Sequence, residues 1–224
     1  MSGVNLYTTV KNPGAFSGFT TFKKNQIIKL EKNIEDIKKL KSYVLHKPIR
    51  KKFQRRKVFV PFINYQWVAD LVDVQKLSRQ NKGVRYILLV IDAFSKKLYF
   101  AFLKDKTAIS TLNGLKRIFR ESGIVPKYLQ TDKSKEFENL EVQNYLKSLN
   151  IDWFHTYTKI KASIVEIVFR TIMTKQARYF SHSGHQKYTE VFADIVESYN
   201  STYHLSIKMK PNDVSLNNKV SVRP

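Results

Sequence analysis

Residues 66–73 read Gln-Trp-Val-Ala-Asp-Leu-Val-Asp, in which the apolar run from Trp67 to Val72 contains one carboxylate, Asp70. The run is short and partly β-branched, which predicts a strand over Trp67–Val74. A lone charge inside an apolar strand costs on the order of several kcal/mol, so Asp70 is expected to bind a metal ion or to have a cationic partner. An ordinary salt bridge or a solvent-facing position is the alternative.

The same kind of pattern continues toward the C-terminus. Further strands are predicted over Tyr86–Ile91, Leu98–Leu103, Tyr128–Thr131 and Asp152–His155. Helices are predicted over 107–121, 140–149, 163–180 and 189–203. Gly123 is expected to close the first of these helices, and the first three strands are expected to be antiparallel neighbours. The order β-β-β-α-β-α-β-α-α predicts an α/β domain with a mixed sheet.

The composition points to a polyanionic partner. Forty Lys and Arg against 18 Asp and Glu give a formal net charge of +22 over 224 residues. Nucleic acid is the leading candidate because phosphates reward dispersed cations, and a solvated basic surface is the alternative. The chain has no cysteine, which excludes disulfides and zinc sites with thiolate ligands. No apolar run is long enough to span a bilayer, so a soluble intracellular protein without a membrane partner is expected.

The charge is densest before residue 65. Residues 1–64 carry 15 basic and 3 acidic residues, whereas residues 65–224 carry 25 and 15. Three segments are therefore predicted: a basic helical N-terminal segment and arm over 1–64, the α/β domain over 65–215 and a tail over 216–224. Helical spacing of Ile27, Leu30, Ile34, Ile37, Leu40 and Val44 predicts one or two amphipathic helices over Phe22–Leu45.

A basic arm follows these helices. Six of the eight residues from 50 to 57 are cationic, namely Arg50, Lys51, Lys52, Arg55, Arg56 and Lys57. Pro48 precedes them and disfavours a continuous helix. Three interpretations stay open: the arm lies along DNA phosphates, it is a nuclear-localisation signal, or it is a solvated linker.

Two more acids resemble Asp70 in their placement. Asp132 follows a predicted strand directly, and Glu166 lies in the first turns of a predicted helix. Alone, Asp132 is typical of a turn and Glu166 of an acid that complements the helix dipole. Together, three carboxylates from separate elements suit two Mg²⁺ ions, which need hard oxygen ligands on both sides of a phosphodiester. Asp73 and Asp92 are possible alternative ligands, but Asp92 ends a predicted strand before Ala93-Phe94-Ser95, which favours a turn.

From about Tyr43 to Val214 the chain resembles integrases of the retroviral superfamily, most closely those of Polinton (Maverick) DNA transposons. The resemblance rests on six ordered segments: 45–53, 66–73, 91–96, 129–132 with Glu136-Phe137, 161–166 with Arg170-Thr171, and 199–204 with Pro211. It implies an RNase H-like fold with a mixed five-stranded sheet flanked by helices. It also implies that Asp70, Asp132 and Glu166 hold two Mg²⁺ or Mn²⁺ ions.

In such an enzyme, water cuts near the 3′ end of the element DNA, and the freed 3′-hydroxyl then attacks target DNA. The resemblance therefore implies a metal-dependent polynucleotidyl transferase and endonuclease that acts in the nucleus as a homo-oligomer on element ends and target DNA. Lys159 and Lys161 match a region that contacts element DNA in the family. The alternative interpretation is that both are solvated lysines of a loop without a DNA contact.

Two departures from the family pattern favour a different outcome. Ser134 occupies a position where the family usually has glycine, which predicts a strained turn. Ile167, Val168 and Phe169 replace a stretch that supplies Arg and Asn beside the metal site. A catalytically decayed or repurposed DNA-binding protein is therefore the alternative. A third interpretation, an RNase H-type nuclease acting on RNA–DNA hybrids, shares the metals but leaves the basic N-terminal segment and residues 200–204 without a role.

Overall fold

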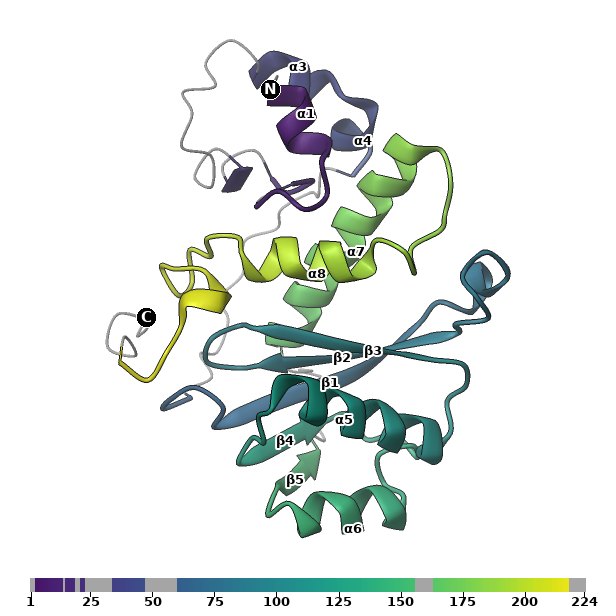
Figure 1. Cartoon of the computed structure of the whole chain (residues 1–224), viewed down its shortest axis with the longest axis vertical. Coiled ribbons are helices and arrows are strands. Elements are labelled where there is room, and N and C mark those ends of the chain that lie inside the picture. Colours follow the sequence, from purple (N-terminus) through teal and green to yellow (C-terminus); the bar gives the residue numbers. More distant parts are fainter. Residues whose placement is uncertain are drawn as a thin grey trace.

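The computed structural model describes residues 3–13, 15–18, 21–22, 34–46, 60–155 and 163–217. A sheet lies at its centre, with helices on both faces (Figure 1). The strands are β1 (Gln66–Asp73), β2 (Tyr86–Asp92), β3 (Leu98–Leu103), β4 (Tyr128–Thr131) and β5 (Asp152–His155). Their spatial order is β3-β2-β1-β4-β5. The pairs β1–β2 and β2–β3 are antiparallel, and the pairs β1–β4 and β4–β5 are parallel. The predicted mixed sheet and its antiparallel first three strands are confirmed.

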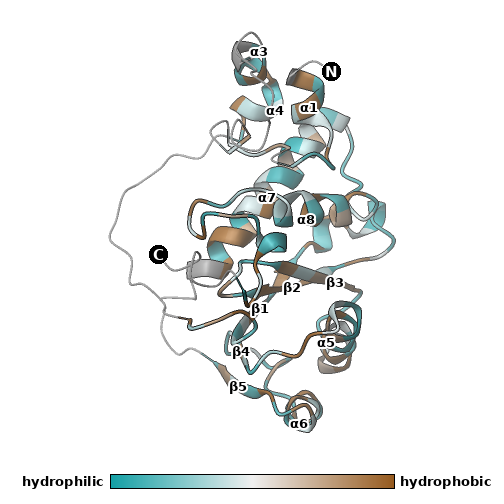
Figure 2. Cartoon of the chain, turned by 60° about the vertical axis from the view of Figure 1, so that its left-hand side comes forward, coloured by the Kyte–Doolittle hydropathy of each residue, from teal (hydrophilic) through white to brown (hydrophobic). Residues whose placement is uncertain are grey.

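Each face of the sheet has its own hydrophobic core. Helices α5 (Ala108–Ser122) and α6 (Leu140–Ser148) cover one face, and α7 (Ser163–Ser183) and α8 (Phe192–Asn200) cover the other. Side chains along β1 alternate between these cores: Trp67 and Ala69 pack on the α5–α6 side, whereas Val68 and Val72 pack on the α7–α8 side. Strand β2, between β3 and β1, is buried over almost its whole length, and Figure 2 shows its hydrophobic residues in brown.

Helix α5 forms as its sequence predicts. The Thr107 side chain accepts a hydrogen bond from the Ser110 amide at 3.2 Å, which caps the first turn. Gly123 ends the helix in the left-handed conformation with φ of 64°. Gly114 lies against the sheet so closely that a Cβ atom would be 3.0 Å from the side chains of Leu88 and Leu103. A small residue at this position therefore sets how near α5 can approach.

The last two helices differ from the prediction at their ends. Helix α7 was predicted to end at Phe180 but continues to Ser183. Gly184, with φ of 74°, ends it there. Helix α8 begins at Phe192 rather than at 189, because the Asn81 side chain accepts hydrogen bonds from the amides of Tyr188 and Thr189 and holds a turn there. It ends at Asn200, whose side chain bonds both backbone groups of Leu98 at 2.9 Å.

The remaining helical elements of the described chain are short. Two 3₁₀ turns, η2 (Gln75–Gln80) and η3 (Pro211–Asp213), follow β1 and α8. The N-terminal helices are α1 (Gly3–Thr8), α3 (Ile34–Lys39) and α4 (Lys41–Val44). Helix α1 was not predicted, and Leu40, with ψ of 126°, separates α3 from α4. Among the helices of the described ranges, none combines the length and apolarity that a membrane crossing requires.

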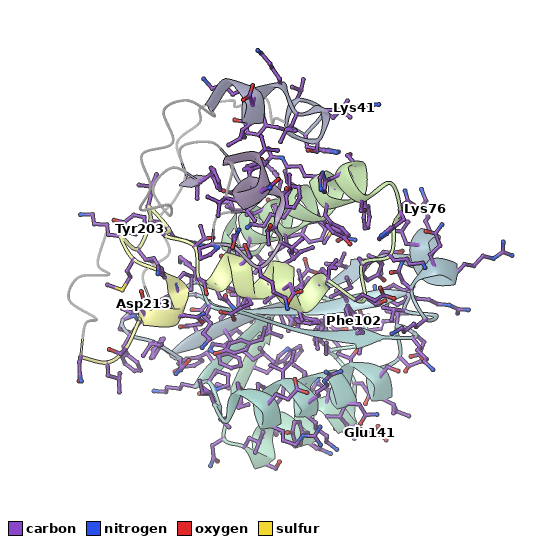
Figure 3. The ribbon with its side chains drawn as sticks, turned by 45° about the horizontal axis from the view of Figure 1, so that its top comes forward. Lys41, Lys76, Phe102, Glu141, Tyr203 and Asp213 are labelled. Carbon is purple, nitrogen blue, oxygen red and sulfur yellow. The ribbon has the colours of Figure 1, made fainter. Side chains whose placement is uncertain are left out.

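These N-terminal residues pack against α7 rather than standing apart from it. Tyr7, Phe16, Phe22, Ile37 and Tyr43 form a small buried cluster that the half-buried Tyr179 of α7 joins. The three helices lie beyond α7 and α8 as seen from the sheet (Figure 1). We call the described residues up to 46 the N-terminal unit. Figure 3 shows Lys41 of this unit and Glu141 of α6 at opposite ends of the molecule.

Two buried cations of α7 join the N-terminal unit to the rest of the chain. Lys175 donates hydrogen bonds to the Ala15 carbonyl at 2.7 Å and to the Ser198 hydroxyl at 3.1 Å. Arg178 donates to the Phe16 carbonyl at 2.5 Å and lies over the Tyr43 ring. Both side chains are only 3% exposed. Burial, and secondarily the charge of Arg178, lowers the pKa of Lys175 to about 7.

Candidate functional site

Asp70 and Asp132 lie beside each other on neighbouring parallel strands. The β1–β4 register pairs Trp67 with Leu129 and Val68 with Gln130. The same offset, continued by two residues, places Asp70 level with Asp132, which follows the last residue of β4. Adjacent strands are about 4.8 Å apart, so the two carboxylates leave the sheet as neighbours although 61 residues separate them in the sequence.

Both carboxylates belong to the face of the sheet that α7 covers. Asp70 lies between Val68 and Val72 in the strand alternation, and those two valines belong to the core beneath α7. Gln66 and Gln130 lie on this same face of β1 and β4. The Gln66 side-chain amide donates a hydrogen bond to the Gln130 side-chain oxygen at 2.6 Å. Asp70 is half-buried, and its Oδ1 accepts a hydrogen bond from the Leu71 amide at 2.9 Å. The two carboxylates thus lie at the C-terminal end of β4, and both are partly exposed to water.

Glu166 lies on α7, the helix that covers the same face of the sheet. It lies in the first turn of that helix, between Val165 and Val168, which are buried in the core under α7. The Glu166 side chain is exposed and borders an open hollow of about 450 Å³ that His46, Arg170 and Met173 also line. The third predicted acid is therefore on the expected helix and above the expected face.

The donor chemistry of the carboxylate pair fits a divalent cation. Asp70 on β1 and Asp132 directly after β4 carry hard oxygen atoms, which are the ligands that Mg²⁺ and Mn²⁺ prefer. Within the described ranges, no three His, Asp or Glu side chains are grouped closely enough to hold an ion together. The structure therefore brings Asp70 and Asp132 to one level but does not gather Glu166 into the same cluster. The assignment of all three as metal ligands stays a prediction.

A charged pair next to Asp132 was not anticipated from the sequence. The Lys106 ammonium lies 3.0 Å from Oε1 of Glu136, and the Glu136 side chain is only 6% exposed. The hydrogen bond to Glu136 is the largest cause of a raised Lys106 pKa, and the charges of Glu136 and Asp132 add to it. The sequence offered one weak signal, a Glu-Phe pair four residues after Asp132, but it did not point to Lys106.

Asp92 is a turn residue, as interpreted from the sequence, and Asp73 accepts hydrogen bonds from Gln75 at the end of β1. Asp92 is buried, and its carboxylate accepts hydrogen bonds from the amides of Asn64, Phe94 and Ser95 and from the Ser95 hydroxyl. Burial raises the Asp92 pKa despite these bonds. Asp73 is exposed and accepts from the backbone and side-chain nitrogens of Gln75 at 2.9 and 3.0 Å.

The two departures from the family pattern have different structural outcomes. Ser134 is absent from the described non-glycine residues with positive φ, so the strained turn predicted there is wrong. A negative φ is open to any L-residue, and this turn needs no glycine. Ile167 is 43% exposed, whereas Val168 is buried in the core and Phe169 packs against it. The apolar replacements therefore leave one large hydrophobic side chain in water next to Glu166.

The predicted DNA-contacting cations cannot be placed. Arg50, Lys51, Lys52, Arg55, Arg56, Lys57, Lys159 and Lys161 all lie outside the described residues. The three interpretations of the basic arm stay predictions, as do the DNA contacts of the two loop lysines.

Comparison with known proteins finds a family match over part of the chain. Residues 63–159 match the family described as integrase core domain. A transposon-derived protein of Caenorhabditis elegans is 30% identical over 141 residues, which cover 63% of this chain. The match covers 49% of that protein, so this chain spans about half the length of the curated relative.

Solved structures with the same arrangement come from retroviral integrases. The magnesium complex of the HTLV-2 integrase catalytic core domain, in a trimeric form, aligns with a TM-score of 0.57 at 15% identity, covering 68% of this chain and 97% of that one. A simian T-cell lymphotropic virus intasome bound to a PP2A regulatory subunit aligns with a TM-score of 0.60 at 16% identity, covering 89% and 72%. The chain thus has the RNase H-like fold of integrase catalytic cores, and residues 63–159 match the integrase core domain.

Proposed function

We propose that this chain is a DNA integrase of a mobile element that catalyses metal-dependent 3′-end processing and strand transfer into target DNA. The placement of Asp70 and Asp132 at one level of adjacent parallel strands carries the proposal, because phosphoryl transfer needs carboxylates that bracket one phosphodiester. Glu166 lies in the first turn of α7, the helix that covers the same face. The integrase core domain match and the magnesium complex of the HTLV-2 core support it.

The carboxylates provide the fixed part of the reaction. Asp70 and Asp132 would hold two Mg²⁺ or Mn²⁺ ions with Glu166, and these ions, when bound, activate the attacking oxygen and stabilise the charge that develops. The strands prevent Asp70 and Asp132 from moving apart, which keeps the scissile phosphate in one orientation. No side-chain nucleophile is required, because water attacks in the first step and the freed DNA 3′-hydroxyl attacks in the second.

The partners follow from charge and from the relatives. A net charge of +22 favours DNA over a neutral ligand. Because two element ends must meet at one target, we expect a homo-oligomer, and the HTLV-2 core is known in dimeric and trimeric forms. A nuclear location and the specific likeness to Polinton elements belong to the same proposal.

One observation favours a second function, a DNA-binding protein derived from an integrase. Ile167 follows Glu166 directly and is 43% exposed, although an exposed isoleucine makes no polar contact to a metal site or to a phosphate. A chain that had lost catalysis would keep its basic surface and its fold. Such a protein would bind DNA and make no product.

The test is nicking and strand transfer on labelled duplex DNA with Mg²⁺ or Mn²⁺, run beside an EDTA control. Asp70→Asn, Asp132→Asn and Glu166→Gln should each abolish product while DNA binding persists. Asp73→Asn is the matched control, because Asp73 lies on the same strand, points to the opposite face and accepts hydrogen bonds from Gln75. Metal-dependent product that survives in Asp70→Asn, or wild-type binding without any product, would contradict the integrase assignment.

A further inference from the structure

The Lys106–Glu136 pair lies at the end of the sheet where the candidate carboxylates emerge. Strand β3 runs parallel to β1 and β4, because each of β1 and β3 is antiparallel to β2 and β1 is parallel to β4. The segments that follow β3 and β4 therefore leave the sheet at the same end. Lys106 is three residues beyond β3, and Glu136 is four residues beyond Asp132.

A backbone turn and the buried neighbour Phe137 fix the position of Glu136. The amides of Phe137 and Glu138 donate to the Ser134 carbonyl at 3.1 Å and close a turn, and Phe137 is fully buried in the core under α5 and α6. A carboxylate that is only 6% exposed requires a cation or several donors. Lys106 supplies the cation, and its own side chain stays 47% exposed. One end of the pair is thus anchored, and the other faces water.

This pair differs from the other ion pairs of the described residues. Lys11–Asp194 is long, at 3.8 Å, and Arg117–Glu121 is a pair within α5 whose two side chains are about half exposed. Such exposed pairs are weak, because water screens their charges, and they do not hold their side chains in one place. Lys106 is different because a buried carboxylate holds its ammonium in place, close enough to Asp132 for their charges to interact. An ammonium group has three donors, of which Glu136 needs one.

We propose that Lys106 is a phosphate-binding residue of the active site, whose ammonium Glu136 holds beside Asp132 to contact a DNA phosphate next to the reacting one. The proposal rests on the proposed function, since it takes DNA as the ligand of this end of the sheet. A fixed cation whose charge interacts with that of Asp132 offsets part of the repulsion between this carboxylate and the DNA backbone. Glu136 is a positioning residue that acts through Lys106.

The experiment compares two charge-neutral double variants by fluorescence anisotropy on a labelled duplex at increasing KCl. Lys106→Gln with Glu136→Gln removes both charges, so no uncompensated buried carboxylate remains and the net charge is unchanged. Arg117→Gln with Glu121→Gln does the same to the exposed pair near the C-terminal end of α5. Thermal unfolding of both proteins checks that they stay folded.

The expected result is a smaller salt dependence in the first variant alone. One lost phosphate contact lowers the slope of log affinity against log salt by about 0.9, which at about 0.1 M salt weakens binding on the order of tenfold. Lys106→Arg should restore the slope, because arginine keeps the charge and pairs with both carboxylate and phosphate. Equal slopes in the two double variants and the wild type would show that the pair is structural only and would overturn the proposal.

A single variant tests the positioning role of Glu136. Glu136→Gln alone keeps Lys106 but frees its ammonium from the carboxylate that holds it, so its slope should fall below that of the wild type although the variant carries one more positive charge. A slope equal to or steeper than that of the wild type would show that Glu136 does not position Lys106 and would overturn the proposal. The readout is binding, so a wild type that binds through Lys106 but makes no product would remove the integrase activity and leave this contact standing.

Discussion

Replacement of Lys175 by methionine should remove a pH-dependent part of the folding free energy. The ammonium is 3% exposed, and burial lowers its pKa from 10.5 to about 7. Between these two pH values the unfolded chain carries a proton that the folded chain has lost. The free energy of unfolding therefore rises with pH through this window, by up to about 1.4 kcal/mol for each pH step of one. Below about pH 7 both states are protonated, and the cost of burying the charge stays constant.

The magnitude across the whole window is about 5 kcal/mol, from the difference between 10.5 and about 7 at about 1.4 kcal/mol per pH step. Other titrating groups lie near Lys175 but are common to both proteins. Arg178 stays charged, and His204, whose pKa burial lowers to about 4, titrates below the window. Subtraction of the Lys175→Met curve from the wild-type curve thus isolates Lys175.

The assay is urea unfolding of both proteins between about pH 7 and about pH 9, where the predicted difference in free energy changes by about 2 to 3 kcal/mol. Lys187→Met is the matched control, because Lys187 is exposed and its removal leaves the N-terminal unit undisturbed. The wild type should gain stability with pH relative to Lys175→Met, and Lys187→Met should follow the wild type. A wild-type curve parallel to that of Lys175→Met would refute the burial of a cation at this site.

Three further predictions concern the fold. Asn200→Ala should cost about 2 to 4 kcal/mol in urea unfolding, because it strips both backbone groups of Leu98 of their partner, and a value near zero would contradict these bonds. Gly114→Val should cost about 1 to 3 kcal/mol by overpacking α5 against the sheet, measured by the same method; an unchanged stability would mean that α5 lies farther out. Asp92 has a raised pKa, so the folded state keeps its proton longer than the unfolded state, and wild-type stability should fall relative to Asp92→Asn as pH rises above about 4, as thermal unfolding in acidic buffers can test.

The sheet was predictable because its signals are local. Each strand is a short apolar run bounded by polar residues, and Thr107 and Gly123 mark the ends of α5 in the sequence. Asp70 was conspicuous for the same reason, as the lone charge of an apolar strand. The level pairing of Asp70 with Asp132 was not readable from either segment, because the register between two strands depends on how the whole sheet packs.

The missed features depend on tertiary contacts. Helix α1 has only six residues, too few for a periodic pattern to be visible. Lys175 and Arg178 resemble any basic residues of a strongly basic chain, and nothing local indicates that carbonyls of the N-terminal unit satisfy them. Lys106 and Glu136 are separated by 29 residues of sequence, so only the parallel arrangement of β3 and β4 makes them neighbours.

The docking of the N-terminal unit on α7 also constrains when the protein can fold during synthesis. Tyr7 and Phe16 bury themselves against residues of α7 that are made more than 150 positions later. At ordinary translation rates, roughly 10 to 30 seconds pass before α7 follows them from the ribosome. The five strands and α5 can assemble in that interval, since all of them precede α7 in the chain. The first part of this protein to be synthesised is therefore among the last to reach its native place, and its aromatic side chains wait in solvent until α7 arrives.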